Sequence, residues 1–425
     1  MPDAPTGPAR NSAHVLRPLS RDDIPQFLDI DQWAFAYDTT EKAVSARNFA
    51  DGMDWDHVHG VSTGPDAPLA GVYGWLPFLL TVPGGRLPCA GVTAVGVHPL
   101  YRRQGCLRAM MQHHLADAAG AGRPVSALFA AEPAIYGRFG YGAASMSMRM
   151  TIGRGAALRE LPGTHEPRLR MELVDPDRHA EELAECFESW RSRRPGTVDR
   201  YGAPHRVAPL LDPPESRHGA ETLRVLVAEG RDGGPARGYA LFRRKLPEDS
   251  YDGGTVLIRE LVAHDPVTAR ALWRTLLDMD LMDSVSTCRL ALDDPIVHLL
   301  VDSRAPKPTV KDNLWLRIVD VPAALAGRRY AAPIDTVLEV RDELVGANTG
   351  RWHLRGGPLD ASCTRTQAPA DLAMDVRELA SAYLGGHSLA VLAAAGLVEE
   401  LVPGALAPAA TAMGWPVAPI STWCF

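Results

Sequence analysis

The chain has 425 residues, more than one compact domain holds, and its 46% hydrophobic and 22% charged residues are an ordinary globular composition. The 44 Lys and Arg against 51 Asp and Glu give a net charge of −7. This charge argues against nucleic acid as a main partner, because phosphate binding needs clustered basic residues. The six cysteines form no CxxC pair and no zinc spacing, so we expect a reducing compartment and no bound metal.

The N-terminal segment and the lengths of the apolar runs predict the compartment in which the protein functions. The first fifteen residues are polar and rich in Pro, Ala and Gly, without the apolar run of a secretion signal. No apolar run elsewhere is long enough to cross a bilayer. We therefore expect a cytoplasmic protein with no membrane partner.

Helix and strand patterns alternate over the first 155 residues. Ser20 followed by Asp22 and Asp23 predicts a helix start, because a serine cap and acidic first-turn residues stabilise a helix N-terminus. A second helix, with apolar residues at helical spacing, begins after residue 105 and ends near Ala119. The predicted strands are Leu69–Thr81, Gly91–His98 and Val125–Ala131.

A short loop, Arg102-Arg103-Gln104-Gly105, separates the second of these strands from the helix. A helix start presents unpaired N–H groups and the positive end of the helix dipole, and a glycine lets an anion approach the backbone closely. Arg102, Arg103 and Arg108 add positive charge. The pattern predicts a site for a phosphate-bearing cofactor, although an Arg-x-x-Gly loop alone is as readily a surface turn.

The segment Ala134–Gly142 reads AIYGRFGYG and follows the next strand. A tyrosine hydroxyl with a pKa of about 10 can donate a proton at neutral pH. The alternative is a half-buried aromatic whose hydroxyl is satisfied within the fold, and this fits Tyr141 and Phe139 better than Tyr136. Tyr136 is therefore the candidate proton donor.

A similar order of elements recurs in residues 238–295, which we interpret as a weak internal repeat. The expected elements are a strand over 238–244, a strand over 255–264, a helix over 268–282 and a strand over 288–292. Val267-Thr268-Ala269-Arg270 stands where the first copy has its glycine loop. We expect the second copy to keep the fold and to lack the cofactor site.

The last part of the chain begins after a Pro-containing linker at residues 303–312. Strands are predicted over 316–319 and 336–341. The Ala- and Leu-rich runs 388–395 and 405–413 predict helices that pack against apolar surface. The final segment, Pro416–Phe425, is also apolar, so we expect it to dock, although most chain termini fray.

Three phrases carry a resemblance to a known family. VTAVGVHPLYRRQGCLRAMM resembles the acyl-CoA signature of the GNAT superfamily, Arg/Gln-x-x-Gly-x-Gly/Ala, with Leu107 at the last small position. AIYGRFGYG and LWLRIVDVPAAL resemble the Eis (enhanced intracellular survival) aminoglycoside acetyltransferases, which also carry a larger residue at the position of Leu107. The resemblance implies an α/β (α+β) fold with tandem GNAT acyl-CoA acyltransferase-like domains, residues 1–155 and 156–308. A sterol-carrier-protein-like α/β domain, residues 309–425, follows.

The resemblance also implies which residues form the site. Two neighbouring strands splay apart in GNAT folds and hold the pantetheine arm, so Tyr136 would lie near the cofactor sulfur as the general acid. The main-chain carboxylate of Phe425 would be the general base. The implied cofactor contacts are Val95, Gly96, Val97, Arg103, Gln104, Gly105, Cys106, Leu107, Arg108, Ala131 and Glu132.

Two residues bear on the acceptor. Asp38 falls where the family places an acidic residue of the amine pocket, although a solvated helix end is an equal interpretation. Cys424 departs from the family, which has an acid before the terminal Phe, and this removes a negative charge from the amine pocket. His113-His114 resembles a metal pair but lies within a helix without a carboxylate partner, so we expect no metal there.

The implied function is acetyl transfer from acetyl-CoA directly to primary amines of a polyamine such as an aminoglycoside, an antibiotic-resistance activity. The implied assembly is a homohexamer. Two alternatives stay open. One is a protein lysine Nε-acetyltransferase, and the other is a non-catalytic lipid- or sterol-binding protein built on GNAT scaffolds.

Overall fold

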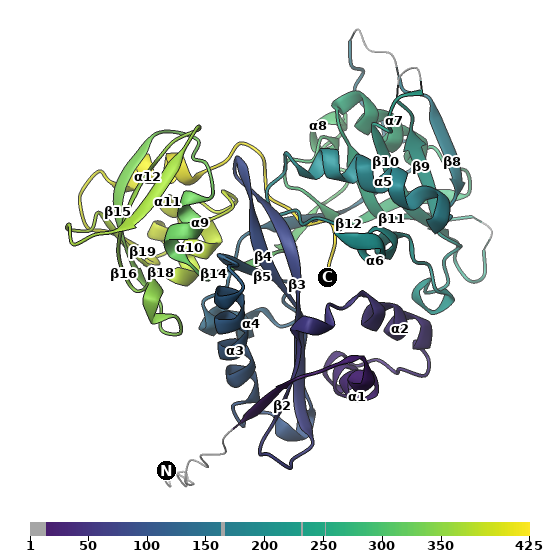
Figure 1. The fold of residues 1–425 in the computed structure, drawn as a ribbon. Helices are drawn as coiled ribbons and strands as arrows, with labels where there is room; N and C mark the ends of the chain where they lie inside the picture. The colour runs from purple at the N-terminus through teal and green to yellow at the C-terminus, as the bar shows by residue number, and fades with distance from the viewer. Residues whose placement is uncertain (1–13, 163–165, 231–232, 251) are drawn as a thin grey trace, which may run out of the picture. The chain divides into compact units, whose positions relative to one another are not determined.

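The structure is a computed structural model that describes residues 14–162, 166–230, 233–250 and 252–425. The polar N-terminal stretch considered above lies outside the described residues as far as residue 13. The chain divides into two compact units, residues 1–76 with 92–117 and residues 77–91 with 118–425. Two long strands, β3 (Leu69–Val82) and β4 (Gly85–Val97), pass from one unit to the other (Figure 1).

Three sheets with flanking helices make up the described part of the chain, which confirms the predicted α/β class. The first sheet has the strand order β1-β2-β3-β4-β5-β14-β6. The second has the order β13-β7-β12-β11-β10-β9-β8, and the third has the order β17-β16-β15-β18-β19. Among the strand pairs of the described residues, β4–β5, β11–β12 and β15–β18 are parallel, one pair in each of the three sheets above.

The first unit is built from short antiparallel strands and three helices. Ser20 and Asp23 form a capping box ahead of the first helix, which confirms the predicted helix start. Apolar side chains of α1, including Phe27 and Ile30, pack with Val72 of β3 in a buried cluster. The elements of this unit, besides β3 and β4, are β1 (Val15–Pro18), α1 (Ile24–Phe35), α2 (Ala43–Gly52), β2 (Val58–Ser62) and α3 (Cys106–Gly120).

In the second unit, β4 pairs in parallel with β5 (Val125–Leu128) over three residues only. The pairs run from Cys89–Val125 to Gly91–Ala127, and no later pair joins the two strands among the described residues. This short register agrees with the splayed strands that the resemblance implies. After β5 come the short helix α4 (Pro133–Tyr136) and the strand β6 (Gly142–Ala143).

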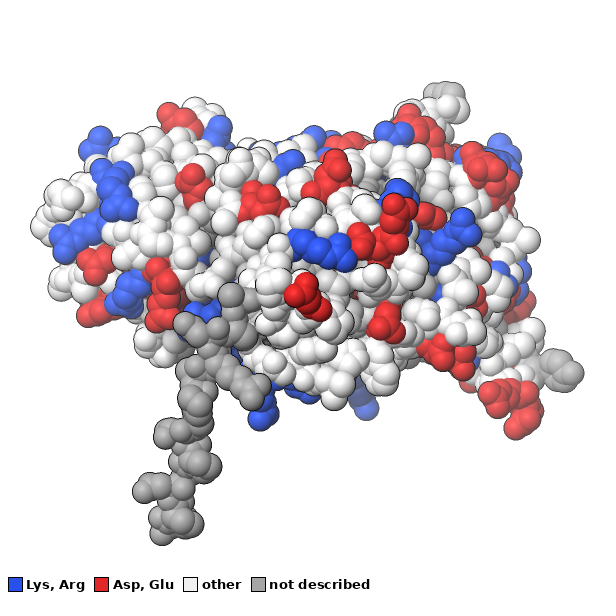
Figure 2. Space-filling view, turned by 60° about the horizontal axis from the view of Figure 1, so that its bottom comes forward, with Lys and Arg blue, Asp and Glu red and all other residues white. Residues whose placement is uncertain are grey.

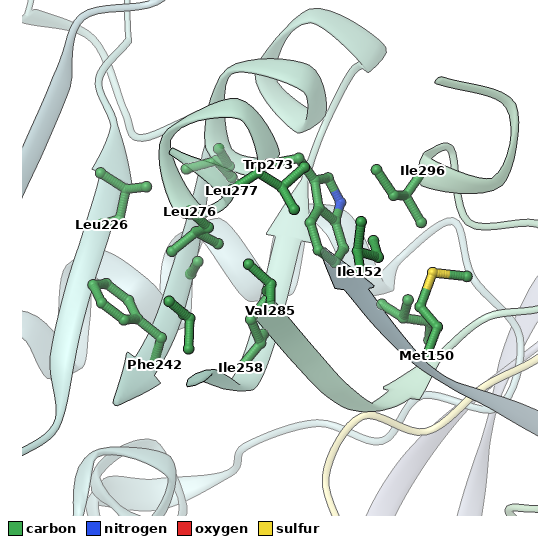
Figure 3. Packing of buried hydrophobic residues seen from close by; sticks show 14 of the residues in the cluster. Met150, Ile152, Leu226, Phe242, Ile258, Trp273, Leu276, Leu277, Val285 and Ile296 are labelled. Carbon is green, nitrogen blue, oxygen red and sulfur yellow. The ribbon is translucent and has the colours of Figure 1, made fainter. Parts of the chain in front are cut away.

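The second sheet has its own apolar core, shown in Figure 3. Trp273 and Leu276 of α7 point onto the sheet, where they meet Ile258 and Val285, and all four are buried. The strands are β7 (Met146–Gly153), β8 (Leu169–Leu173), β9 (Arg224–Ala228), β10 (Gly238–Lys245), β11 (Gly254–Ala263) and β12 (Met282–Leu290). The helices are α5 (Pro176–Arg191), α6 (Gly202–Val207), α7 (Pro266–Leu277) and α8 (Ile296–Leu299).

The helix expected over 268–282 is shorter than predicted. It ends at Leu277, and Met282 already belongs to β12. Leu281 has a φ of 66°, a left-handed conformation that turns the chain from the helix into the strand. Apolar spacing alone did not reveal this turn, because Met279 and Met282 continue the helical pattern.

Strand pairing differs from the domain boundaries expected from sequence. The expected third domain starts at residue 309, but β13 (Thr309–Asp312) pairs with β7 in the second sheet. The next strand, β14 (Trp315–Ile318), lies between β5 and β6 in the first sheet. Residues 309–318 therefore contribute one strand to each of the two preceding sheets. Strand β7, which was expected in the first domain, belongs to the second sheet.

The third sheet and its helices follow residue 320. The strands are β15 (Ile334–Arg341), β16 (Gly350–Gly356), β17 (Ala361–Arg365), β18 (Leu372–Asp375) and β19 (Val398–Glu400). The helices are α9 (Val321–Ala326), α10 (Val376–Ala382), α11 (Leu389–Ala394) and α12 (Leu406–Met413). Helix α11 lies against α12 and β19 through one face, where Leu389 is buried and Leu392 and Ala393 are half-buried, while Val391 on the other face is 66% exposed.

Surface charges are mixed in sign. Figure 2 shows basic and acidic side chains interspersed over one face. Ion pairs such as Arg206–Glu181 (2.8 Å) join opposite charges at the surface, and exposed pairs contribute about 0–1 kcal/mol each. No helix in the described part of the chain has the length and apolar content that a membrane span requires.

Candidate active site

The loop between β4 and α3 is open to solvent. Arg102, Arg103, Gln104 and Gly105 are all exposed, and Gly105 has a φ of 92°, a conformation that glycine adopts without strain. Among the described residues, no carboxylate forms an ion pair with Arg102, Arg103 or the exposed Arg108. An exposed helix start with uncompensated arginines fits a pyrophosphate.

The start of α3 orients its first side chains in different directions. Cys106 is only 2% exposed and packs into the core, where burial raises the pKa of its thiol. Leu107 is half-buried and Arg108 is exposed. Cys106 can therefore reach a ligand at this loop through its main-chain N–H, whereas Arg108 can use its side chain.

The end of β4 carries a local distortion. Ala94, directly before the predicted contacts Val95, Gly96 and Val97, has a φ of 52°. A non-glycine residue in this left-handed region costs on the order of 1–3 kcal/mol, and such residues concentrate at ligand sites. Gly96 is buried against α1, because a Cβ at this position would lie 2.9 Å from Cβ of Ala34.

Two carboxylates of the first unit, Asp38 and Asp31, differ in their exposure to solvent. Asp38 is exposed, and its Oδ1 accepts hydrogen bonds from the backbone N–H groups of Thr40 (2.6 Å) and Glu41 (3.4 Å). Its place in the amine pocket stays a prediction. Asp31 is buried and accepts a hydrogen bond from the Tyr37 hydroxyl at 2.7 Å, and burial raises its pKa to about 6. No spacing in the sequence pointed to Asp31.

Tyr136 ends the short helix α4 in the second unit. Its side chain is half-buried, and no described residue hydrogen-bonds to its hydroxyl. Burial, with a smaller contribution from Glu132, raises its pKa to about 12, so the hydroxyl keeps its proton at neutral pH. Tyr141 differs, because it is fully buried and its hydroxyl lies 2.8 Å from that of Ser126. The hydroxyl of Tyr136 is thus available to a ligand.

The C-terminal segment is held by hydrogen bonds over most of its length. Its partners lie in β11 and β12, in the segments that follow β12 and β13, and in the loop after α5, and Figure 1 shows the segment, in yellow, ending beside α6 and β12. The hydrogen bonds are Ala418 N–H to Asp293, Arg194 to Ala418 O, Ile420 N–H to Pro195 O, Ser421 N–H to Asn313, Arg289 to Thr422 O, and Thr422 Oγ1 to Glu260.

This segment enters where β11 and β12 stop pairing. Their parallel register ends at Ile258–Thr287, although β11 continues to Ala263 and β12 to Leu290. Beyond that point Glu260 of β11 and Arg289 of β12 both bond to Thr422. The gap between β11 and β12 therefore holds the C-terminal segment of the same chain.

The ring of Phe425 completes the docking. It packs against Phe78 at 4.7 Å and Phe129 at 5.3 Å between ring centroids. Gly91 makes room for these rings, because a Cβ there would lie 2.4 Å from the Phe78 ring and 3.0 Å from Phe425 Cε2. Phe129 lies two residues before Ala131, on the segment that leads to Tyr136.

In the second copy of the repeat, a side-chain carboxylate caps the N-terminus of the helix. Asp265 caps α7, and its carboxylate accepts hydrogen bonds from Thr268 N–H (2.9 Å) and Thr268 Oγ1 (2.8 Å). Asp265 also pairs with Arg237 at 2.7 Å. A carboxylate at this end of a helix occupies the place that a phosphate would take, and its negative charge would repel the phosphate. The geometry agrees with a second copy that lacks the cofactor site.

Comparison with known proteins gives the family. Profiles described as acetyltransferase (GNAT) domains match residues 15–144 and 196–318, and a sterol carrier protein domain matches residues 321–422. The N-acetyltransferase Eis of Mycobacterium tuberculosis is 37% identical over 346 residues, which cover 78% of this chain and 80% of that protein.

The chain belongs to the Eis family of GNAT N-acetyltransferases. Among its relatives, an uncharacterized N-acetyltransferase of Streptomyces coelicolor is 44% identical over 354 residues, 82% of this chain and 84% of the relative. The crystal structure of Eis1 from Mycobacterium abscessus superposes with a TM-score of 0.81 at 32% identity and covers 97% of this chain and 100% of that one. The tandem GNAT and sterol-carrier-like order is confirmed, and this Eis-family chain is an acetyltransferase with acyl-CoA as co-substrate.

The structure also shows residues that sequence reasoning missed. Phe78, Phe129 and Gly91 form the seat of the terminal ring, and Glu260 and Arg289 hold the segment behind it. None of them stands in a motif. No group of three or more His, Cys, Asp or Glu is arranged to hold a metal within the described part of the chain.

Gly91→Ala tests the seat of the terminus. The added methyl would force the Phe78 ring to move and would displace Phe425, while the loop at Gly105 is unaltered. We expect kcat to fall by about 10–100-fold, because a catalytic group displaced by about 1 Å can lose two orders of magnitude. The KM for acyl-CoA should hardly change in steady-state assays.

Gly153→Ala is the matched control, since it is also a strand glycine and a Cβ there meets nothing within 4 Å. Both variants are checked for a normal melting temperature. Normal kcat in a folded Gly91→Ala enzyme would show that the position of the terminal ring does not matter.

Proposed function

We propose that the chain transfers the acetyl group of acetyl-CoA directly to a primary amine, with the Phe425 carboxylate as base and Tyr136 as acid. The observation that carries the proposal is the docked terminus. Hydrogen bonds from the rest of the chain to four residues of the segment, Ala418, Ile420, Ser421 and Thr422, and the packing of Phe425 on Phe78 and Phe129 hold a segment that frays in most proteins.

The chain's own residues account for both proton transfers. The amine nitrogen forms a bond to the thioester carbon, and the Phe425 carboxylate accepts the proton that the nitrogen loses. As the carbon–sulfur bond breaks, Tyr136 donates its proton to the departing thiolate. An α-carboxylate with a pKa of about 3.5 is a weak base, so its contribution would come from positioning and partial burial.

The first unit would hold the pyrophosphate of the cofactor. The exposed loop Arg102–Gly105 and the start of α3 suit the pyrophosphate, and Arg103 and Arg108 supply charge. The acetyl thioester supplies the activated acyl group. Val95, Val97, Ala131 and Glu132 remain proposed contacts to the rest of the cofactor.

The proposed acceptor is a primary amine of a polyamine such as an aminoglycoside. Lysine Nε-acetylation is the enzymatic alternative, and a lipid carrier on GNAT scaffolds is the non-catalytic one. A thiol-release assay with acetyl-CoA separates them, first with kanamycin and then with a lysine peptide, against a blank without amine. We expect amine-dependent release of CoA thiol, and no release with any amine would favour the carrier.

The proposal includes a cytoplasmic homohexamer. Exposed apolar side chains in the third domain, among them Leu359, Val391 and Val402, provide surface for such contacts.

Tyr136→Phe removes the proposed proton donor and keeps the ring. We expect kcat to fall by about 10²–10⁴, the usual share of a general acid, with unchanged binding of acetyl-CoA. Pre-steady-state release of thiol and calorimetric binding measure the two quantities. Tyr141→Phe is the control, because its hydroxyl is bonded to Ser126 and has no proposed chemical role. Wild-type kcat in Tyr136→Phe would remove this residue from the mechanism.

The terminal carboxylate can be moved without changing its chemistry. Deleting Phe425 moves the terminal carboxylate back along the chain by up to about 3.6 Å. A base must lie within about 3.2 Å of its proton partner, or one water away, so this shift would take the carboxylate out of reach. The deletion should abolish transfer. A C-terminal extension should do so as well, because it converts the carboxylate into a neutral amide.

Phe425→Ala keeps the carboxylate and loses the packing on Phe78 and Phe129, so partial activity should remain. The melting temperature is measured with kcat for each variant. Full kcat in the truncated or extended enzyme, at a normal melting temperature, would exclude the carboxylate as base.

A further inference from the structure

A pocket of about 220 Å³ lies in the second unit beside the C-terminal segment. Arg200, Arg259 and Arg289 contribute three positive charges to its walls, and Glu260 contributes one negative charge. Cys424, the residue before the terminus, also lines it. The pocket occupies the region where β11 and β12 have stopped pairing, and nothing in the mechanism above uses it.

The single carboxylate of the pocket is already committed. Glu260 accepts hydrogen bonds from Arg200 (2.6 Å), from the Tyr239 hydroxyl (2.6 Å) and from Thr422 Oγ1 (2.9 Å). Burial acts to raise its pKa, but the charge of Arg200 and these hydrogen bonds outweigh burial and lower it, so Glu260 stays ionised. Arg200 and Glu260 therefore neutralise each other.

The other two arginines have no such partner. Arg259 donates to the backbone carbonyls of Leu211 (2.7 Å) and Ala208 (3.5 Å), and Arg289 donates to that of Thr422 (3.1 Å). Within the described residues, neither forms an ion pair with a carboxylate. Each guanidinium has five N–H donors, so donors remain on both.

Charges of both signs surround Arg259. Burial is the largest cause that lowers its pKa, repulsion from Arg243 and a smaller repulsion from Arg289 lower it further, and Glu260 and Asp212 act to raise it. Asp212 is itself bonded to Arg243 and Arg217. Arg259 and Arg289 thus line a small pocket without a carboxylate paired directly to either of them, an arrangement that a bound anion would stabilise.

Cys424 adds no charge to the pocket wall, where an acidic residue, which the resemblance implies at this position, would place a carboxylate. The cysteine side chain is exposed and neutral, and leaves the space open. Trp423 and Cys424 line the pocket, and Phe425 is the next residue of the chain, so the pocket lies within one residue of the terminus along the chain.

We propose that this pocket binds an anionic group, a carboxylate or a phosphate, carried by the acetyl acceptor. Guanidinium forks bind both groups through paired hydrogen bonds. The inference rests on the proposed function and narrows its acceptor class from a purely cationic polyamine to an amine that also bears an anionic group. The Phe425 carboxylate would receive the amine while Arg259 and Arg289 hold the anionic end.

The first experiment measures the pocket without catalysis. Inorganic phosphate is titrated by calorimetry into the full-length protein with saturating CoA, which occupies the loop at Gly105. Cys424→Glu restores an acid to the pocket, and Cys424→Gln is its neutral control of the same size. We expect phosphate binding by wild type and Cys424→Gln, and at least tenfold weaker binding by Cys424→Glu. Equal binding by all three, or none by wild type, overturns the pocket as an anion site.

The second experiment decides whether the anion belongs to the acceptor. The kcat/KM of acetylation is compared for lysine and lysinamide, which differ by one carboxylate. We expect wild type and Cys424→Gln to prefer lysine at least tenfold and Cys424→Glu to lose this preference. Equal use of the two amines, or acetylation of kanamycin alone, overturns the acceptor assignment, even if free phosphate binds. If no amine releases CoA thiol, the proposed function fails, while the titration still decides the pocket.

Discussion

The parallel register of β11 and β12 ends halfway along the two strands, and the chain's last residues fill the opening. Glu260 stands at the centre of this contact. Removing a carboxylate from water costs several kcal/mol unless it is paired and hydrogen-bonded. Arg200, Tyr239 and Thr422 provide those bonds, so the terminal segment contributes one of the three hydrogen bonds that stabilise the ionised Glu260. The position of Phe425 follows from this buried network and from the aromatic seat around it.

The two GNAT domains differ at the same structural point. In the first, the helix after the central strand starts with an exposed glycine loop and unpaired arginines. In the second, Asp265 caps the corresponding helix and supplies the negative charge that a phosphate would otherwise bring. The gaps between the parallel strands of the two domains also differ in what they hold. The gap between β4 and β5 is proposed for the pantetheine arm of the cofactor, whereas the gap between β11 and β12 holds the chain's own C-terminal segment.

Charge near the terminus constrains the choice of acceptor. A polycation needs carboxylates, yet Asp38 is occupied with its own turn and Cys424 is neutral. Arg259 and Arg289 add positive charge beside the terminal residues. These charges are the basis for the proposal that the acceptor carries an anionic group beside its reacting amine.

The sequence by itself determined the features that arise from neighbouring residues. The glycine loop, the capping box at Ser20, the helical face of α3 and Tyr136 after its strand are local, because conformation and periodicity extend over a few residues. The resemblance supplied the domain order and pointed to Phe425. Only the tertiary structure decided that residues 309–318 complete two other sheets, because a strand pattern does not name its partner. It also decided the hold on the terminus, where Thr422 meets Glu260 across 162 residues and Ser421 meets Asn313 across 108. Such contacts depend on where whole sheets lie, and the basic pocket exists only because they bring Arg259, Arg289 and Cys424 together.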